Sequence, residues 1–162
     1  MRSLYRITLA LFFVALMGCS ADEQAERHYH LASGEQISFS DLEGKVVLIN
    51  YWAEWCSPCR EEIPELNALQ HQFVDEVVVL GVNFDGLVGE ELAAQAKKMG
   101  IEFALLEDDP REEFGVAPSG VLPETLVIDR RGEFQQVLLG PQSLSSLQHV
   151  VASLPEEMNL SQ

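Results

Sequence analysis

Two cysteines, Cys56 and Cys59, are separated by two residues in the segment Trp-Ala-Glu-Trp-Cys-Ser-Pro-Cys. The apolar run Val46–Tyr51 precedes them and a helical apolar pattern follows from Ser57, which predicts a helix that begins directly after a buried strand. One helical turn brings the two sulfur atoms together, and the N-terminus of a helix stabilises a thiolate, most directly on the first sulfur. We therefore predict a redox-active disulfide, with Cys56 as the nucleophile and Cys59 as the thiol that resolves the mixed disulfide.

Other uses of a close Cys pair fit the sequence less well. Attachment of c-type haem requires His after the second Cys, and that residue is Arg60. A structural zinc site requires four ligands, and the chain has neither a second close Cys pair nor a spaced His pair. We predict no metal and no cofactor beyond the disulfide, and His28, His30, His71 and His149 are expected to be solvated. A static disulfide stays open as an alternative, although so short a loop restrains the unfolded chain only weakly.

The elements that must position the Cys pair alternate between strands and helices. Beyond the strand and helix around the pair, the predicted elements are a hairpin of His28–Leu31 and Ile37–Phe39, strands at Val77–Val82, Phe103–Leu106, Glu124–Ile128 and Phe134–Leu139, a helical turn at Arg111–Phe114, and helices at Glu90–Met99 and Ser143–Leu154. Pro64 is expected to kink the helix that follows the Cys pair. This order predicts an α/β fold with a mixed central sheet, helices on both faces and an extra N-terminal hairpin.

The beginning of the chain resembles a bacterial lipoprotein signal. Arg2 and Arg6 precede the apolar run Ile7–Leu16, which is about half as long as a bilayer-spanning helix. The run leads into Leu-Met-Gly-Cys, which is similar to the lipobox, in which the Cys, here Cys19, receives the lipid. A plain signal peptide or an uncleaved anchor is the alternative. We expect a lipid-anchored protein that faces the periplasm, and Ser20 after the Cys favours the outer over the inner membrane.

Length and charge limit the remaining possibilities. The 162 residues suit one globular domain, which we place at 28–162, after a signal peptide at 1–18 and a tether at 19–27. The 26 acidic residues exceed the 10 basic ones and give a net charge of −16, which disfavours binding to nucleic acids and anionic membrane surfaces. We expect a monomer.

Four segments together resemble the TlpA/ResA-like family of membrane-tethered thiol–disulfide oxidoreductases, which have the thioredoxin fold. The matching segments are 41–59, 62–66 (Glu-Ile-Pro-Glu-Leu), 79–83 (Val-Leu-Gly-Val-Asn) and 122–129 (Leu-Pro-Glu-Thr-Leu-Val-Ile-Asp). The resemblance implies that Pro123 is a cis proline that faces the Cys pair, and that the Leu122 backbone pairs with an incoming peptide like an added strand. It also implies that Trp55 packs beside the nucleophile.

A carboxylate that accepts the Cys59 proton is harder to place. Asn50 stands where cytosolic thioredoxin-like chains carry a buried acid. The tethered group often uses a carboxylate after the second strand, where Asp85 is the nearest candidate and Glu90 the next. Burial would raise the pKa of such a carboxylate and suit it to accept a proton. A solvated acid at the start of a helix or in a loop is the alternative for both.

The resemblance implies a disulfide reductase for specific exported proteins, supplied by an upstream membrane thiol donor. Apocytochrome c before haem attachment is the favoured substrate class by resemblance. Glu124 replaces a common Thr directly after Pro123, so the partner is not taken from the family. The alternative function is a lipid-anchored chaperone or a copper-delivery protein, since copper(I) accepts two thiolates. The direction of exchange depends on the redox potential.

Overall fold

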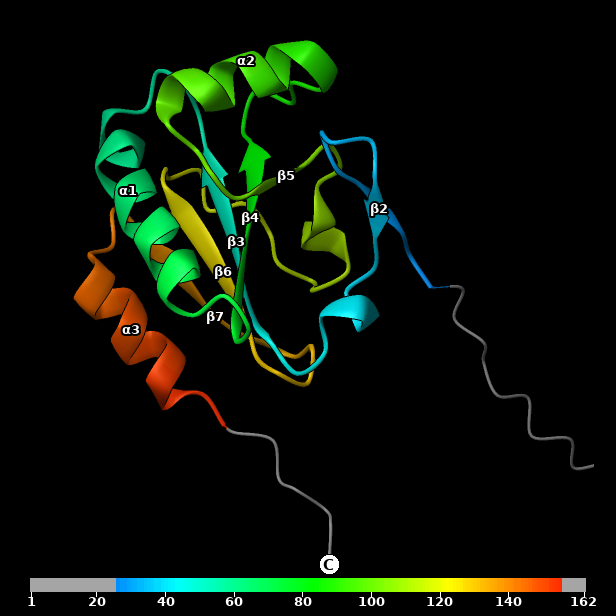
Figure 1. The fold of residues 1–162 in the computed structure, drawn as a ribbon, viewed down its shortest axis with the longest axis vertical. Helices are drawn as coiled ribbons and strands as arrows, with labels where there is room; N and C mark the ends of the chain where they lie inside the picture. The colour runs from blue at the N-terminus through cyan, green and yellow to red at the C-terminus, as the bar shows by residue number, and fades with distance from the viewer. Residues whose placement is uncertain (1–25, 156–162) are drawn as a thin grey trace, which may run out of the picture.

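The computed structural model describes residues 26–155, and Figure 1 shows them as a central sheet with helices packed against it. The elements are β1 (Tyr29–His30), β2 (Gln36–Ile37), the 3-10 helix η1 (Ser40–Leu42), β3 (Val46–Trp52), α1 (Ser57–Gln72), β4 (Val77–Asn83), α2 (Gly89–Met99), β5 (Ala104–Leu106), the 3-10 helix η2 (Pro110–Glu112), β6 (Glu124–Ile128), β7 (Phe134–Leu139) and α3 (Leu144–Ser153). The predicted signal peptide, Cys19 and most of the predicted tether lie outside the described residues.

The central sheet has five strands in the order β5-β4-β3-β6-β7. Strands β3, β4 and β5 run parallel, whereas β6 is antiparallel to β3 and β7 is antiparallel to β6. All seven residues of the central strand β3 are buried, because both of its faces are covered. The predicted mixed sheet is therefore confirmed, and β3 leads directly from the core to the Cys pair.

The three α-helices lie together on one face of the sheet, where the sequence predicted helices on both faces. Leu48 of β3 packs in one cluster with residues of α1 and α3, and Trp52 packs in another with residues of α1 and α2. The connections from β3 to β4 and from β4 to β5 step in the same direction across the sheet. Because such crossovers are right-handed, they place α1 and α2 on the same face.

The second face carries shorter elements. The predicted N-terminal hairpin is formed by β1 and β2, which pair antiparallel as a small separate sheet. Tyr29 and Phe39 meet edge to face with ring centroids 5.2 Å apart, and Phe39 meets Phe114 in the same way at 4.8 Å. These side chains pack with Ile49 and Tyr51 of β3 in one apolar cluster. The hairpin, η1 and the segment around η2 thus cover the face that lacks α-helices.

The element boundaries lie within two residues of the predicted ones. Helix α1 extends from Ser57 to Gln72 and contains Pro64 in its interior. Helix α2 ends as predicted at Gly100, whose φ of 74° is the left-handed conformation that glycine adopts most easily. Within residues 26–155, no helix combines the length and the hydropathy needed to cross a bilayer.

Candidate active site

Cys56 and Cys59 form a disulfide at the start of α1, with their Cα atoms 5.3 Å apart. Cys56 is the N-cap residue of this helix, and its sulfur accepts a hydrogen bond from the backbone N–H of Cys59 at 3.2 Å. The Cys56 side chain keeps a small accessible area, whereas Cys59 is fully buried. The predicted disulfide is confirmed, and the helix supplies a backbone donor to the sulfur that the sequence assigned as the nucleophile.

An exposed aromatic side chain lies immediately before the pair. Trp55 is 65% exposed, yet its indole N–H faces both carboxylate oxygens of Asp85, with N–O distances of 3.1 and 3.2 Å. Its ring also meets the ring of Phe84 edge to face, with centroids 6.0 Å apart. Asp85 and Phe84 follow β4, so the end of the neighbouring strand holds the indole in place.

Neither carboxylate predicted to accept the Cys59 proton is buried with the Cys pair. Asp85 is exposed and bonds to Trp55, and Glu90 is exposed in the first turn of α2. Both acids are therefore solvated, which is the alternative that the sequence left open for them. The physical reason is that this segment turns outward before α2 begins, with Phe84 and Val88 also exposed.

The buried acid of the site is Glu62, which was not among the carboxylates predicted from the sequence. It is 1% exposed and lies one helical turn after the buried Cys59, on the same face of α1. Its Oε2 accepts a hydrogen bond from the Asn50 side-chain amide at 2.7 Å, and its Oε1 accepts one from the backbone N–H of Gln142 at 3.1 Å. Burial raises the pKa of Glu62 to about 7. The two hydrogen bonds act in the opposite direction and lower this pKa, but burial has the larger effect.

A signal for Glu62 was present in the spacing along α1. The buried side chains of this helix recur at three- and four-residue intervals, namely Cys59, Ile63, Leu66 and Leu69, and Glu62 falls on the same stripe. A carboxylate in an apolar stripe one turn from a reactive thiol is a candidate proton acceptor. Asn50 of β3 donates a hydrogen bond to this carboxylate from the neighbouring strand.

The loop before β6 approaches the Cys pair from a different part of the chain. The Leu122–Pro123 peptide bond is cis, as the resemblance implies. Leu122 packs against the cluster that contains Cys56 and Cys59, and also against the cluster on the opposite face of the sheet. Val121 is 47% exposed beside it. The structure thus brings Trp55, Leu122 and Pro123 to the same end of the sheet as the disulfide.

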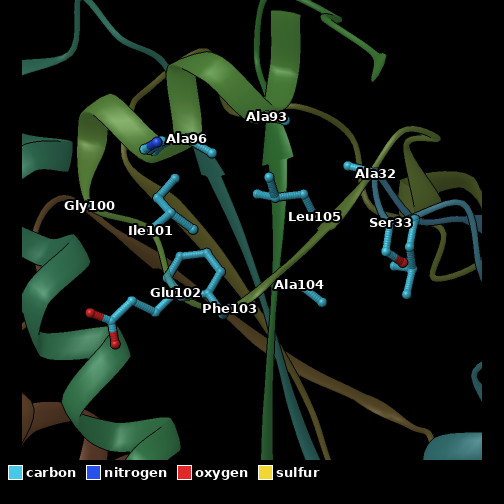
Figure 2. Close-up of a pocket in the computed structure, with 12 residues that line it drawn as sticks. Ala32, Ser33, Ala93, Ala96, Gly100, Ile101, Glu102, Phe103, Ala104 and Leu105 are labelled. Carbon is cyan, nitrogen blue, oxygen red and sulfur yellow. The ribbon is translucent and has the colours of Figure 1, made fainter. Parts of the chain in front are cut away.

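The cavity shown in Figure 2 lies elsewhere, between α2, β5 and the end of the hairpin. It has a volume of about 500 Å³ and is lined mostly by small and apolar side chains, among them Ala93, Ala96, Ile101 and Leu105. None of its lining residues belongs to the Cys loop or to the Pro123 loop. In the described part of the chain, no group of three or more His, Cys, Asp or Glu side chains is placed to hold a metal ion.

The chain is similar in sequence to proteins of known families. The family model described as the AhpC/TSA family matches residues 18–137. The thioredoxin-like protein YneN of Bacillus subtilis (strain 168) is 35% identical over 112 residues, which cover 67% of this chain and 64% of YneN. The thiol-disulfide oxidoreductase ResA of Geobacillus kaustophilus (strain HTA426) is 31% identical over 125 residues, which cover 75% of this chain and 70% of ResA. The chain thus spans about two thirds of the length of these relatives.

Solved structures share the fold. The DsbF homologue from Corynebacterium diphtheriae has a TM-score of 0.69 at 26% identity, over 80% of this chain and 84% of that chain. The exposed lipoprotein thioredoxin Etrx1 from Streptococcus pneumoniae strain TIGR4 has a TM-score of 0.62 at 24% identity, over 80% of this chain and all of that chain. At that identity the second similarity concerns the fold alone.

Proposed function

The chain belongs to the AhpC/TSA family of thioredoxin-like proteins, and from this premise we propose that it is a thiol–disulfide oxidoreductase that reduces disulfides in specific exported proteins. The observation that carries the proposal is the Cys56–Cys59 disulfide at the start of α1, beside the Pro123 loop. The names of the relatives YneN and ResA support it.

The proposed cycle begins with the reduced pair. The Cys56 thiolate attacks one sulfur of a substrate disulfide, which forms a mixed disulfide and releases the other substrate sulfur as a thiolate. Cys59 then loses its proton and attacks the Cys56 sulfur, which releases the second substrate thiolate and forms the Cys56–Cys59 disulfide. Two electrons pass to the substrate in each cycle. An upstream thiol donor must return two electrons to the pair before the next cycle.

We propose that Glu62 accepts the proton of Cys59 in the second step. Cys59 is fully buried, so its thiol needs an acceptor within the protein. Glu62 lies one turn away on the same helix face, and its pKa of about 7 suits proton transfer near neutral pH. Asn50 and Gln142 donate to the two carboxylate oxygens and so stabilise the charged form that accepts the proton.

Substrate binding is assigned to the side chains around the disulfide. We propose that Trp55 contacts the substrate next to its disulfide, because a large exposed apolar surface beside a reactive sulfur favours such contact. The Leu122 backbone would pair with an extended segment of the substrate, and Pro123 would lie against the bound sulfur. Apocytochrome c is the substrate class that the family resemblance favours. The net charge of −16 favours a basic partner.

Two variants distinguish a role of Asp85 in holding the Trp55 indole from a role in proton transfer. Asp85→Ala removes both acceptors of the Trp55 indole N–H, so we expect the KM for insulin to rise about two- to fivefold, as a lost exposed hydrogen bond would produce. Asp85→Asn keeps a carbonyl oxygen that accepts this bond, and its KM should stay close to that of the wild type. Steady-state insulin reduction with all three proteins makes the comparison. Equal impairment of the Asn and Ala variants in kcat would instead assign Asp85 to proton transfer.

We propose that the protein is anchored to the bacterial envelope by lipid on Cys19 and faces the periplasm. The support is the Leu-Met-Gly-Cys segment after an apolar run too short to span a bilayer. Metabolic labelling with a palmitate analogue tests the anchor. Label that is present in the wild type and absent from Cys19→Ser supports it, and an unlabelled wild type contradicts it.

The proposed activity is tested with the reduction of insulin by dithiothreitol, followed by turbidity. We expect the wild type to accelerate precipitation of the insulin B chain, and a protein that lacks both Cys56 and Cys59 to leave the uncatalysed rate unchanged. Equal rates with both proteins would rule out the oxidoreductase. Tight copper(I) binding by the reduced pair, together with such equal rates, would favour the copper-delivery alternative.

A further inference from the structure

A buried ion pair directly follows Pro123 in the chain. Glu124, the first residue of β6, is 2% exposed, and its Oε2 accepts a hydrogen bond from Nη2 of Arg111 at 2.5 Å. Arg111 belongs to η2 and is 6% exposed. Charges that leave water lose hydration, which a close partner only partly restores. An ion pair at this depth therefore needs an explanation beyond stability.

The Arg111 side chain also contacts the strand that leads to the Cys pair. Its guanidinium lies over the ring of Tyr51, 3.6 Å from the ring centroid. The Tyr51 hydroxyl donates to Oδ1 of Asp109 at 2.7 Å, and the backbone N–H of Arg111 donates to the same oxygen at 3.0 Å. Tyr51 and Glu124 are also register partners in the β3–β6 ladder. Arg111 thus joins the end of β3, which precedes Cys56, to the residue that follows Pro123.

Two polar atoms of the Arg111–Glu124 pair lack hydrogen-bond partners in the part of the chain that the structure describes, whereas the buried carboxylate of Asp129 at the other end of β6 has several. Oε1 of Glu124 and Nη1 of Arg111 are buried without a hydrogen-bond partner among the described residues. Asp129, one residue beyond the end of β6, accepts from the backbone N–H groups of Arg131 and Glu133 as well as from side chains. Two apolar side chains in place of Arg111 and Glu124 would fill the same space without the cost of removing two charges from water. What the ion pair adds is a short, directional bond between two fixed elements.

We infer that Arg111 and Glu124 are positioning residues that hold the Pro123 loop at the separation from Cys56 that a substrate peptide requires. The inference rests on the proposed function and deepens it. Glu124 fixes the position of Pro123 through the backbone, because the two residues share a peptide bond and Glu124 pairs with Tyr51 in the β3–β6 ladder. The pair acts on substrate binding, since neither side chain lies on the α1 face of the sheet, where Cys59 and Glu62 are buried.

The test compares three variants with the wild type. Arg111→Met leaves the Glu124 charge buried and unpaired, so its melting temperature should fall. Arg111→Met/Glu124→Leu removes both charges, and it should melt at or above the wild-type temperature. We expect both to raise the KM for insulin at least about threefold while kcat changes less than about twofold. Arg131→Met, which breaks the pair with Asp129, is the matched control and should keep the wild-type KM.

A second measurement does not depend on activity. Hydrogen exchange, followed by mass spectrometry, should be at least about threefold faster at residues 119–122 in the double variant than in the wild type and in Arg131→Met. A stable double variant with wild-type KM and wild-type exchange at these residues would overturn the inference, and so would a loss confined to kcat. A wild type that fails to reduce insulin refutes the proposed function instead, and the exchange measurement still decides whether the pair positions the loop.

Discussion

The Cys59→Ser variant is expected to accumulate a mixed disulfide with its substrate through Cys56, because no second thiol remains to release it. Insulin turnover should fall by about 10³-fold or more in Cys56→Ser, which lacks the nucleophile, and in Cys59→Ser, which stops after the first step. Only Cys59→Ser should form the covalent adduct, since Cys56 keeps the accessible area and the helix N-cap position while Cys59 is fully buried. Non-reducing gels and mass spectrometry of the adduct measure this difference and identify the partner.

Cys19→Ser is the matched control, because it removes the third cysteine of the chain without altering the pair. It should reduce insulin at the wild-type rate. Adducts that form equally through Cys56 and Cys59 would contradict the assignment of the nucleophile. Full turnover by Cys56→Ser would contradict the proposed cycle as a whole.

The second large effect is expected at Glu62. If the charged carboxylate accepts the Cys59 proton, the rate of mixed-disulfide resolution in the wild type should rise with pH and level off above the pKa of about 7. Glu62→Gln cannot accept the proton, so we expect resolution to slow by about 10²-fold and to lose this inflection. Stopped-flow Trp fluorescence over pH 5 to 9 measures the rate, since Trp55 lies next to Cys56.

Glu61→Gln is the control for Glu62. Glu61 is the preceding residue of α1 and is exposed, so its variant changes the charge equally without touching the buried site. It should keep the wild-type pH profile. A Glu62→Gln protein with an unchanged inflection near pH 7 would show that another group accepts the proton.

Glu62 should also affect the pH dependence of stability in the oxidised protein. Its pKa is about 7 in the folded protein and 4.5 for a solvated glutamate, so between these pH values the folded state binds more protons than the unfolded state. The contribution of protonated Glu62 to the free energy of unfolding is fully present below pH 4.5. It is lost as the pH rises through 7, and the free energy of unfolding falls by up to about 3 kcal/mol. Urea unfolding at pH 5 and pH 8 should show a smaller loss in Glu62→Gln than in the wild type. Equal losses in the two proteins would mean that the burial of this carboxylate carries no cost.

The assignment of Asp85 illustrates the limit of reading a site from the order of residues. The family resemblance places a carboxylate after the second core strand, and Asp85 is the acid nearest to that position. In the fold this segment turns outward, and the carboxylate holds the exposed Trp55 indole. The direction in which the chain turns after β4 depends on how α2 packs against the sheet. The spacing of residues within this segment gives no information about that packing.

Arg111 and Glu124 show the same limit for a buried pair. The sequence marks Glu124 as a departure from a common Thr, and it places Arg111 in a short helical turn thirteen residues earlier. Neither observation indicates that the two charges meet. Their contact exists because η2 folds back over Tyr51, on the face of the sheet that the α-helices leave free.

The sequence alone determined the features that arise from neighbouring residues. These are the Cys56–Cys59 disulfide across one helical turn, the buried strand before it, and the alternation of strands and helices, because helical and strand periodicity act over a few residues. Only the tertiary structure decided which acid is buried beside Cys59, where the three α-helices lie, and which cation meets Glu124. Burial and hydrogen bonding involve residues far apart in the chain, as in the hydrogen bond from the Gln142 backbone N–H to Glu62. The free-energy cost of burying a charge depends on all the groups that exclude water around it.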